Sequence, residues 1–371
     1  MKAGTLLCAT LRPDAEQRLE ELARVWAAPP AGTAELIRHE GAGLWVHRRL
    51  TALGLREQVE PALRTSLRQE VLVTAGTNLR VDEEARRAVR QLREAGIAVI
   101  LIKGAARRAL ASRWPLLDAR ALADVDLLVP PTQLQEAWDC LCATGYELAE
   151  PDRDFSYEKH HHLAPLMGPG AVSVELHRSS SFTLPGERAW ARFESSAEPV
   201  SWQGEPVLVP SATELAWHTI SHAVTDGRSG FRLRHWLDVA ALLAGGAPVD
   251  WAVIRERLAS QPIPSFRSLE PIPESVPRQW LGALVALVPE EASRAWAALT
   301  VPVDLERLLN GRGRYLSWQR RRPRLAQRMM WEWTPAMLGW PHDSLPESVW
   351  HRARWRIGSV AARGAARVMN L

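Results

Sequence analysis

Cysteine is scarce in this chain, and long apolar runs are missing. The 371 residues include only Cys8, Cys140 and Cys142, too few for a disulfide framework and without the second pair that a zinc site would need. The longest apolar stretches, such as Ile97–Ile102 and Leu281–Val288, are far shorter than the ~20 residues of a transmembrane helix. The N-terminus also lacks the pattern of a secretion signal. We therefore expect a cytoplasmic protein with reduced thiols and no membrane span.

Several nucleotide-binding and hydrolase motifs are absent as well. No Gly-Lys dipeptide occurs, which excludes a Walker-type phosphate loop, and neither G-x-G-x-x-G nor G-x-S-x-G is present. Lysine itself is rare, since only Lys2, Lys103 and Lys159 stand among 46 basic residues. Where arginine is used almost everywhere, a remaining lysine is a candidate for a specific role. Lys103 is such a candidate, and the alternative is an ordinary solvated lysine at the end of a strand.

What is present is typical of a globular protein. Hydrophobic residues make up 46% of the chain and charged residues 24%. At roughly 150 residues per domain, the length allows two or three packed units. The sequence therefore predicts a sizeable hydrophobic core.

The spacing of apolar residues changes along the chain from helical to strand-like and back. From Asp14 to about Arg93 they recur at intervals of three and four, and helical patterns return after a capping box at 211–214. Between these regions we predict strands at 97–102, 124–129, 146–148, 162–166, 172–177, 200–202 and 205–209, and helices at 103–110 and 132–144. This order predicts an α+β fold, in which a mixed-sheet core (94–209) lies between helical N-terminal (1–93) and C-terminal (210–371) regions. A proline-rich stretch, 261–277, marks a linker or irregular excursion.

Two aspartates on a predicted internal strand are the most informative feature. Asp124 and Asp126 are two positions apart, so alternation places both side chains on the same face. Paired carboxylates on a buried strand are costly unless a cation neutralises them, and Mg²⁺ prefers carboxylate, phosphate and water oxygens. Glu175, on the predicted strand 172–177, offers a third carboxylate. These residues predict a metal site of Asp124, Asp126 and Glu175.

A candidate phosphate site lies just upstream. The buried strand 97–102 is followed by Lys103, Gly104 and Ala105, which open a helix. Small residues at a helix N-terminus let backbone amides approach a phosphate, and the helix dipole favours the anion. Arg113 and Arg120 are further candidates for phosphate contacts.

The combination of these motifs resembles the bacterial nucleotidyltransferase family proteins of the polymerase β-like superfamily. The residues that carry the resemblance are Ile102–Ala105, Asp118–Val129, Gly145–Tyr146 and Val174–His177. The segment from Glu214 to Leu243 also looks like the helical part that follows the catalytic core in these proteins.

The resemblance implies a nucleotidyltransferase core that uses one or two Mg²⁺ ions and a nucleoside triphosphate, with ATP as the first candidate. Gly104 and Ala105 would form the phosphate turn, Asp124 and Asp126 would bind the metal, and Glu175 would be the third acid, which often helps to activate the attacking hydroxyl. The acceptor would be a hydroxyl of a small molecule, a peptide or a protein, and relatives beside lasso-peptide genes keep a peptide acceptor open. The usual turn of the superfamily is Gly-Gly or Gly-Ser. Ala105 departs from it and motivates an alternative, a non-catalytic nucleotide-sensing or protein-binding module.

Several histidines and one further acid allow more than one interpretation. His160–His162 suggest zinc, but neighbours in a strand point to opposite faces, so we do not expect a zinc site. His218 and His222 share a helix face, and packing is favoured over metal binding. His177, on the face of Glu175, contacts nucleotide or acceptor or makes a structural hydrogen bond. Asp238 is expected to be a buried structural acid paired with an arginine such as Arg234, with support of the site as the alternative.

The C-terminal part is strongly basic. Residues 312–371 hold twelve arginines and three acids, a net charge of +9, interleaved with tryptophans. Arginine with aromatic residues can bind single-stranded nucleic acid, which gives a second alternative, an RNA-binding protein. Inward packing of the tryptophans with solvated arginines is the favoured interpretation.

Overall fold

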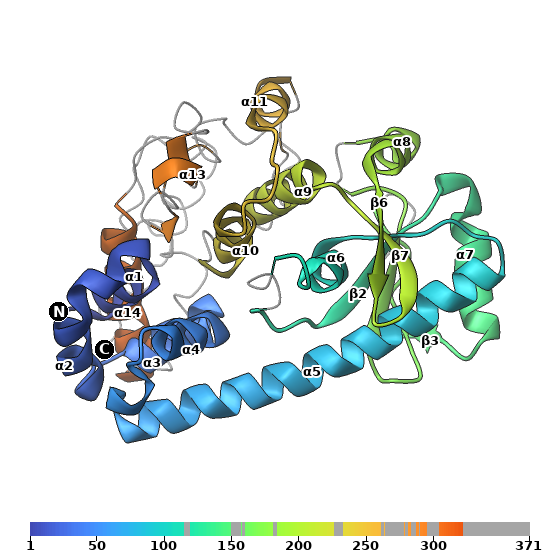
Figure 1. Cartoon of the computed structure of the whole chain (residues 1–371). Coiled ribbons are helices and arrows are strands. Elements are labelled where there is room, and N and C mark those ends of the chain that lie inside the picture. Colours follow the sequence, from blue (N-terminus) through green and yellow to red (C-terminus); the bar gives the residue numbers. More distant parts are fainter. Residues whose placement is uncertain are drawn as a thin grey trace, which may run out of the picture.

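The structure, a computed structural model, contains one mixed β-sheet, and helical regions precede and follow this sheet along the chain (Figure 1). It describes residues 1–114, 119–149, 157, 160–180, 184–225, 233–260, 263, 278, 281–282, 287–288, 290–294 and 304–321. The proline-rich stretch 261–277, apart from residue 263, and the arginine- and tryptophan-rich segment from residue 322 onward lie outside the described residues. In the part of the chain that is described, no helix has both the length and the apolar character that crossing a membrane requires.

The N-terminal region is helical, as the apolar spacing predicts, and it begins earlier than expected. Its α-helices are α1 (Ala3–Leu11), α2 (Leu19–Ala27), α3 (Thr33–Glu40), α4 (Gly43–Ala52) and α5 (Pro61–Glu94). Pro61 starts α5, because a proline at the first helical position lacks only an N–H that would be unpaired anyway. The Glu60 carboxylate caps this end by accepting hydrogen bonds from the amides of Ala62 and Leu63 at 3.0 and 2.7 Å. The 34 residues of α5 run from the N-terminal helices to the sheet (Figure 1).

The sheet has seven strands in the order β3-β4-β5-β2-β1-β7-β6. The strands are β1 (Ile100–Leu101), β2 (Asp124–Leu128), β3 (Glu147–Leu148), β4 (Leu166–Met167), β5 (Ser173–His177), β6 (Glu198–Trp202) and β7 (Glu205–Val209). β2 pairs in parallel with β5 and antiparallel with β1, so the sheet is mixed, as predicted. The hairpin of β6 and β7 turns at Gln203 and Gly204, both with positive φ, which confirms the predicted turn.

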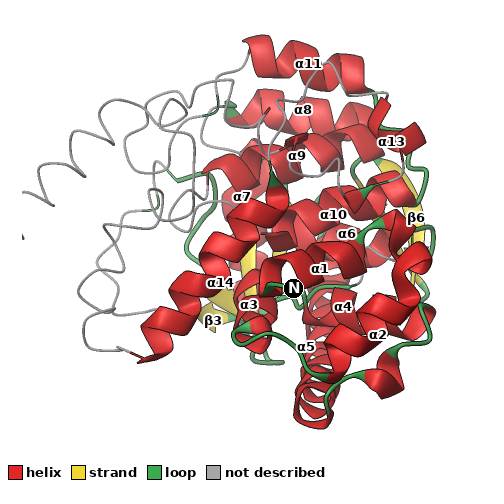
Figure 2. Ribbon diagram, turned by 90° about the vertical axis from the view of Figure 1, so that its left-hand side faces the viewer, coloured by secondary structure: helices red, strands yellow, loops and turns green. Residues whose placement is uncertain are grey.

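Both faces of the central strands are buried. Leu101, Val125 and Leu127 belong to a core shared with α5, α6 (Lys103–Leu110) and α7 (Leu134–Ala143). Ile100 and Leu128 pack on the opposite face against Phe193 of α8 (Gly186–Ser196). Helices cover the sheet in the rotated view of Figure 2 as well. Apart from exposed Ala98, the apolar run 97–102 is therefore buried, as expected, although only two of its residues form a ladder.

The later helices pack against the N-terminal ones. They are α9 (Ala212–Thr225), α10 (Leu233–Ala244), α11 (Trp251–Ser260), α13 (Glu290–Arg294) and α14 (Leu305–Arg321). α14 lies against α1, where Thr5 exchanges two hydrogen bonds with the Asn310 side chain, at 3.2 and 2.9 Å. A Cβ on Gly4 would lie 2.4 Å from the backbone nitrogen of Asn310, so glycine permits this close approach of the two helices. Helices from both ends of the described chain thus share one hydrophobic core.

One strand prediction is wrong. Residues 162–166 were expected to form a strand, but only Leu166 and Met167 pair as β4, while His162 makes an isolated bridge to His177. A bend at residue 164 interrupts the extended backbone on which that prediction depends.

Candidate active site

Two acidic side chains meet where β2 and β5 run side by side. In the parallel register Asp126 lies directly opposite Glu175, so alternation sends both carboxylates to one face. His177, at the end of β5, contacts both acids through Nε2, 2.9 Å from Asp126 Oδ1 and 3.4 Å from Glu175 Oε2. Possible metal-ligating atoms of these three residues all lie within 4.8 Å of one another. The structure thus brings together two of the three predicted acids, with His177 as the third member of the group.

Lys103 is the cationic partner of this group. Its Nζ lies 2.5 Å from Asp126 Oδ1 and 3.9 Å from Glu175 Oε2. Burial opposes the charged form, but Asp126 and Glu175 outweigh it and raise the pKa of Lys103. The backbone of Lys103 has a φ of 47°, an unfavourable value for a residue with a side chain, at the junction of β1 and α6. The solvated alternative for Lys103 is therefore wrong, because its side chain is in the acidic group.

The acids differ in their preference for the charged form. Burial opposes ionisation of Asp126, yet Lys103 and His177 hold its pKa well below the ordinary value. Asp124 has the opposite shift, because the neighbouring Asp126 charge and burial raise its pKa to about 6. The negative charge of Asp126 and burial thus oppose ionisation of Asp124 more strongly than nearby Lys103 favours it. A divalent cation beside Asp124 would favour the ionised form.

Asp124 and Asp126 open into a pocket of about 330 Å³. The pocket is lined by residues of the N-terminal helices, of the segment from α6 to β2, and of α9 and α10. They are Gly41, Leu44, Glu70, Thr74, Lys103, Gly104, Arg107, Ala119, Arg120, Ala121, Leu122, Ala123, Asp124, Asp126, His222 and Arg234. Glu175 and His177, which contact Asp126 from β5, are not among the lining residues. The pocket therefore presents three carboxylates, of Glu70, Asp124 and Asp126, beside four cationic side chains.

The start of α6 forms one wall of this pocket. Gly104 lines it, and a Cβ there would lie 2.6 Å from Leu122 Cδ2, so a side chain would collide with the opposite wall. The Ala105 side chain is fully buried in the core below the turn. Of the two residues predicted to form a phosphate turn, the structure places Gly104 at the pocket and the methyl group of Ala105 in the core.

Asp238 joins two arginines of the pocket. Its Oδ2 accepts a hydrogen bond from Arg120 Nη1 at 2.6 Å and forms an ion pair with Arg107 Nη1 at 3.1 Å. Arg107 is buried, and burial is the main reason that its pKa is lowered to about 10. The expectation that Asp238 pairs with an arginine is confirmed, but its partners are Arg107 and Arg120, whereas Arg234 was the named candidate. Arg113 pairs with Glu198 at 2.6 Å on the surface and does not line the pocket.

The prediction that the side chains of His160–His162 point to opposite faces is wrong. The rings of His160, His161 and His162 lie together, with centroids 4.0 to 4.8 Å apart, and do not point to opposite faces. His162 Nε2 lies 3.6 Å from Glu175 Oε2, so the cluster adjoins the acidic group. Burial lowers the pKa of His160 to about 4 and also lowers the pKa of both neighbours.

His218 and His222 lie on α9 next to the site. Their ring centroids are 6.4 Å apart, and His218 packs edge-on against Phe193 at 6.0 Å. Burial lowers the pKa of His218 to about 3. The packed arrangement fits the favoured interpretation for His218, whereas His222 lines the pocket.

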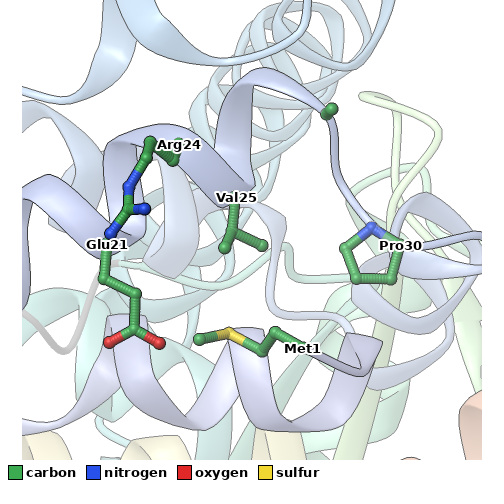
Figure 3. A pocket seen from close by; sticks show the side chains of 6 residues that line it. Met1, Glu21, Arg24, Val25 and Pro30 are labelled. Atoms are coloured by element: carbon green, nitrogen blue, oxygen red, sulfur yellow. The ribbon is translucent and has the colours of Figure 1, made fainter.

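Some residues of the pocket were missed from the sequence. Arg107 lies one helical turn after Lys103, a spacing that could have identified it. Glu70, Thr74 and Arg234 carry no such signal, because tertiary packing alone brings α5 and α10 to this place. A second hollow, of about 590 Å³, lies on the N-terminal helices between Met1, Glu21, Arg24, Val25, Ala28 and Pro30 (Figure 3). Its lining has one acid and one arginine, so it lacks the acidic group that distinguishes the first pocket.

Comparison with known proteins shows the family to which the chain belongs. No curated protein matches it. Among solved structures it is similar to the antibiotic-resistance factor ANT(2'')-Ia, with 15% identity over 48% of this chain and 95% of that one, at a TM-score of 0.34. It is also similar to an antigenic nucleotidyltransferase-like protein from Paracoccidioides brasiliensis, with 15% identity over 68% and 94% of the two chains, at a TM-score of 0.30. Residues 31–266 match the model of an uncharacterised nucleotidyltransferase family. The matched range includes every residue that lines the pocket. The chain belongs to this family and is an enzyme of the nucleotidyltransferase class.

Proposed function

We propose that the chain transfers a nucleoside monophosphate from a magnesium-bound nucleoside triphosphate to a hydroxyl group. The observation that carries this proposal is the pocket in which Asp124 and Asp126 face Lys103, Gly104, Arg107 and Arg120. A triphosphate needs several positive charges and close backbone approach, and its metal needs carboxylate oxygens. Both requirements meet in this pocket.

The cationic side chains and the turn are assigned to the nucleotide. Lys103, Arg107 and Arg120 supply charge to the phosphates, and the start of α6 at Gly104 and Ala105 supplies backbone amides. Asp238 holds the two arginines and acts as a positioning residue. ATP is the first nucleotide to test.

Asp124, Asp126 and Glu175 are assigned to the metal. The donor set is all oxygen, and the raised pKa of Asp124, caused by the Asp126 charge and by burial, supports a cation beside that carboxylate. Bound Mg²⁺ would neutralise charge on the triphosphate and favour the ionised acceptor hydroxyl. The residues present fit such an ion.

The reaction follows from this assignment. The acceptor hydroxyl oxygen forms a bond to the α-phosphorus, and the bond between that phosphorus and the bridging oxygen of the β-phosphate breaks. Pyrophosphate leaves with that electron pair, and the hydroxyl proton passes to a carboxylate, for which we assign Glu175. His177, hydrogen-bonded to Asp126 and close to Glu175, keeps both carboxylates in place. The acceptor belongs to a small molecule, a peptide or a protein.

Calorimetric titration of each nucleoside triphosphate, with and without Mg²⁺, tests the proposal. We expect metal-dependent binding to the wild type and none to the Asp124→Ala, Asp126→Ala double variant. The matched control is Asp14→Ala, Glu20→Ala, which removes two exposed acids of the N-terminal region. Equal binding by both double variants, or no binding by the wild type, would contradict the proposal and favour a non-catalytic module.

A further inference from the structure

We infer that His160, His161 and His162 form a binding site for a divalent transition-metal ion such as Zn²⁺, beside the carboxylate site and separate from it. This inference goes beyond the proposed function and does not rest on it. It depends on the arrangement of three imidazole rings around one point and on the acid that faces them.

The three rings are close enough to share one ion. One ring nitrogen from each histidine lies within 4.8 Å of the others. In a tetrahedral site with metal to nitrogen bonds of ~2.0 Å, the ligand atoms are about 3.3 Å apart. Rotation of the side chains would bring the three nitrogens from their present separation of up to 4.8 Å to the separation that a bound ion requires. The bends at 160 and 161 make this possible, because consecutive residues in a strand would point away from one another.

The orientation of His162 suits a ligand. Its Nδ1 lies 2.6 Å from the Leu163 carbonyl oxygen. A carbonyl oxygen can only accept, so Nδ1 carries the proton and Nε2 has the free electron pair. This Nε2 faces Glu175 Oε2 at 3.6 Å. A metal-bound histidine in proteins commonly donates its other N–H to a carbonyl or carboxylate in this way.

The surroundings of the cluster favour a metal that prefers nitrogen. Three imidazoles suit Zn²⁺, Co²⁺ or Ni²⁺, whereas Mg²⁺ prefers oxygen ligands. Glu175, 3.6 Å from His162 Nε2, supplies a negative charge beside the cluster that favours a cation there. The Tyr157 ring packs against His160 and His162, with centroids 5.7 and 5.6 Å away, and so restricts both rings. The cluster is attached to β5 by the bridge between His162 and His177.

Zinc titration of the full chain tests this inference. The protein should be purified without a histidine tag, treated with a chelator and titrated calorimetrically with Zn²⁺ in excess Mg²⁺, so that the carboxylate site is occupied. We expect one tight site in the wild type and in Asp124→Ala, and at least tenfold weaker binding in His160→Ala, His162→Ala. The matched control is His47→Ala, a histidine of α4 outside the cluster, which should bind as the wild type does. Equal binding by the cluster variant and the control would overturn the inference.

A second measurement needs no variant. X-ray absorption at the zinc edge of the loaded wild type should show three imidazole ligands, and fewer than three would overturn the inference. The melting temperature should rise on zinc addition for the wild type and for Asp124→Ala, Asp126→Ala. If the wild type binds zinc but no nucleotide in the presence of Mg²⁺, the proposed function is wrong and the zinc site stands. If it binds nucleotide with Mg²⁺ but no zinc, the zinc site is wrong and the proposed function stands.

Discussion

Asp126 lies directly opposite Glu175 across the parallel pair of β2 and β5, and Lys103 Nζ reaches both carboxylates, at 2.5 and 3.9 Å. The two acids come from segments 49 positions apart, and the register alone brings them together. A shift of one residue would turn one of them to the other face. The polar centre of this protein is therefore a consequence of strand pairing.

Asp126→Asn should weaken both folding and nucleotide binding. It removes the nearest negative charge from half-buried Lys103; breaking a fully buried ion pair from one side costs about 3–5 kcal/mol, and the low end of that range applies because Lys103 lines the pocket. We expect a loss of that order in the free energy of unfolding, together with at least a tenfold loss of Mg²⁺-ATP affinity. Denaturant unfolding and calorimetry measure the two effects. Asp124→Asn is the matched control, since it leaves the Lys103 pair intact, and equal stability of the two variants would contradict this account.

Asp124→Asn should stabilise the metal-free protein at neutral pH. The folded-state pKa of Asp124 is raised to about 6, from an ordinary value of 3.8, by Asp126 and by burial. The folded protein therefore binds the proton more tightly than the unfolded chain, and the stability associated with this group falls as the pH rises from about 4 to about 6. At ~1.4 kcal/mol per unit, reduced for partial exposure, the variant should gain about 1–2 kcal/mol above pH 6.

Thermal unfolding of wild type and Asp124→Asn over pH 4 to 8, without divalent metal, measures this difference. The gain should disappear at the acidic end of the range, where the wild-type carboxyl is protonated. A constant gain at every pH would show that the charge of Asp124 is not its cause.

Gly104→Ala should disturb the pocket wall through Leu122. The added Cβ would lie 2.6 Å from Leu122 Cδ2, so the end of the leucine side chain must rotate away, at a cost of no more than about 1 kcal/mol in stability. The pocket narrows between these two residues, and nucleotide affinity should fall. Leu122→Ala in the same chain should restore part of the affinity, because it removes the colliding group. Additive losses in the double variant would disprove the proposed contact.

Asp238→Ala should weaken nucleotide binding although Asp238 does not line the pocket. It leaves Arg107 and Arg120 without their common carboxylate, one of them buried. We expect about 3–5 kcal/mol of lost stability and at least a tenfold weaker affinity for ATP. Calorimetry and denaturant unfolding test this. The control is Asp139→Ala, an exposed acid of α7, and an unchanged affinity in Asp238→Ala would show that the arginines need no such support.

The sequence predicted most of what depends on local pattern. The helix at 103–110, the strand of Asp124 and Asp126, the hairpin at Gln203 and Gly204 and the α+β class are confirmed. Each follows from periodicity, from a turn signal or from alternation along a few residues. The division into regions 1–93, 94–209 and 210–371 stays a prediction, as do the catalytic roles of the site residues.

What could not be predicted depends on contacts between distant segments. The gathering of His160–His162 needed the bends before β4, and strand alternation gave the wrong answer there. The contribution of Glu70 and Thr74 to the pocket depends on how α5 crosses the sheet, and Asp238 could have paired with any of the many arginines. No short-range pattern contains this information.

The continuity of α5 limits how the pocket can change its size. This helix carries Glu70 and Thr74 at the pocket, while farther along Arg90 binds Glu205 of the sheet. Sharp helix bends occur at proline, glycine or similar interruptions, and the interior of α5 has one glycine, Gly76. Nothing lies within 4 Å of the position that a Gly76 Cβ would take, so packing does not require glycine there. A bend of α5 is therefore expected at Gly76, two residues from Thr74. The width of the pocket on the side of Glu70 and Thr74 would then depend on the backbone curvature at this one residue.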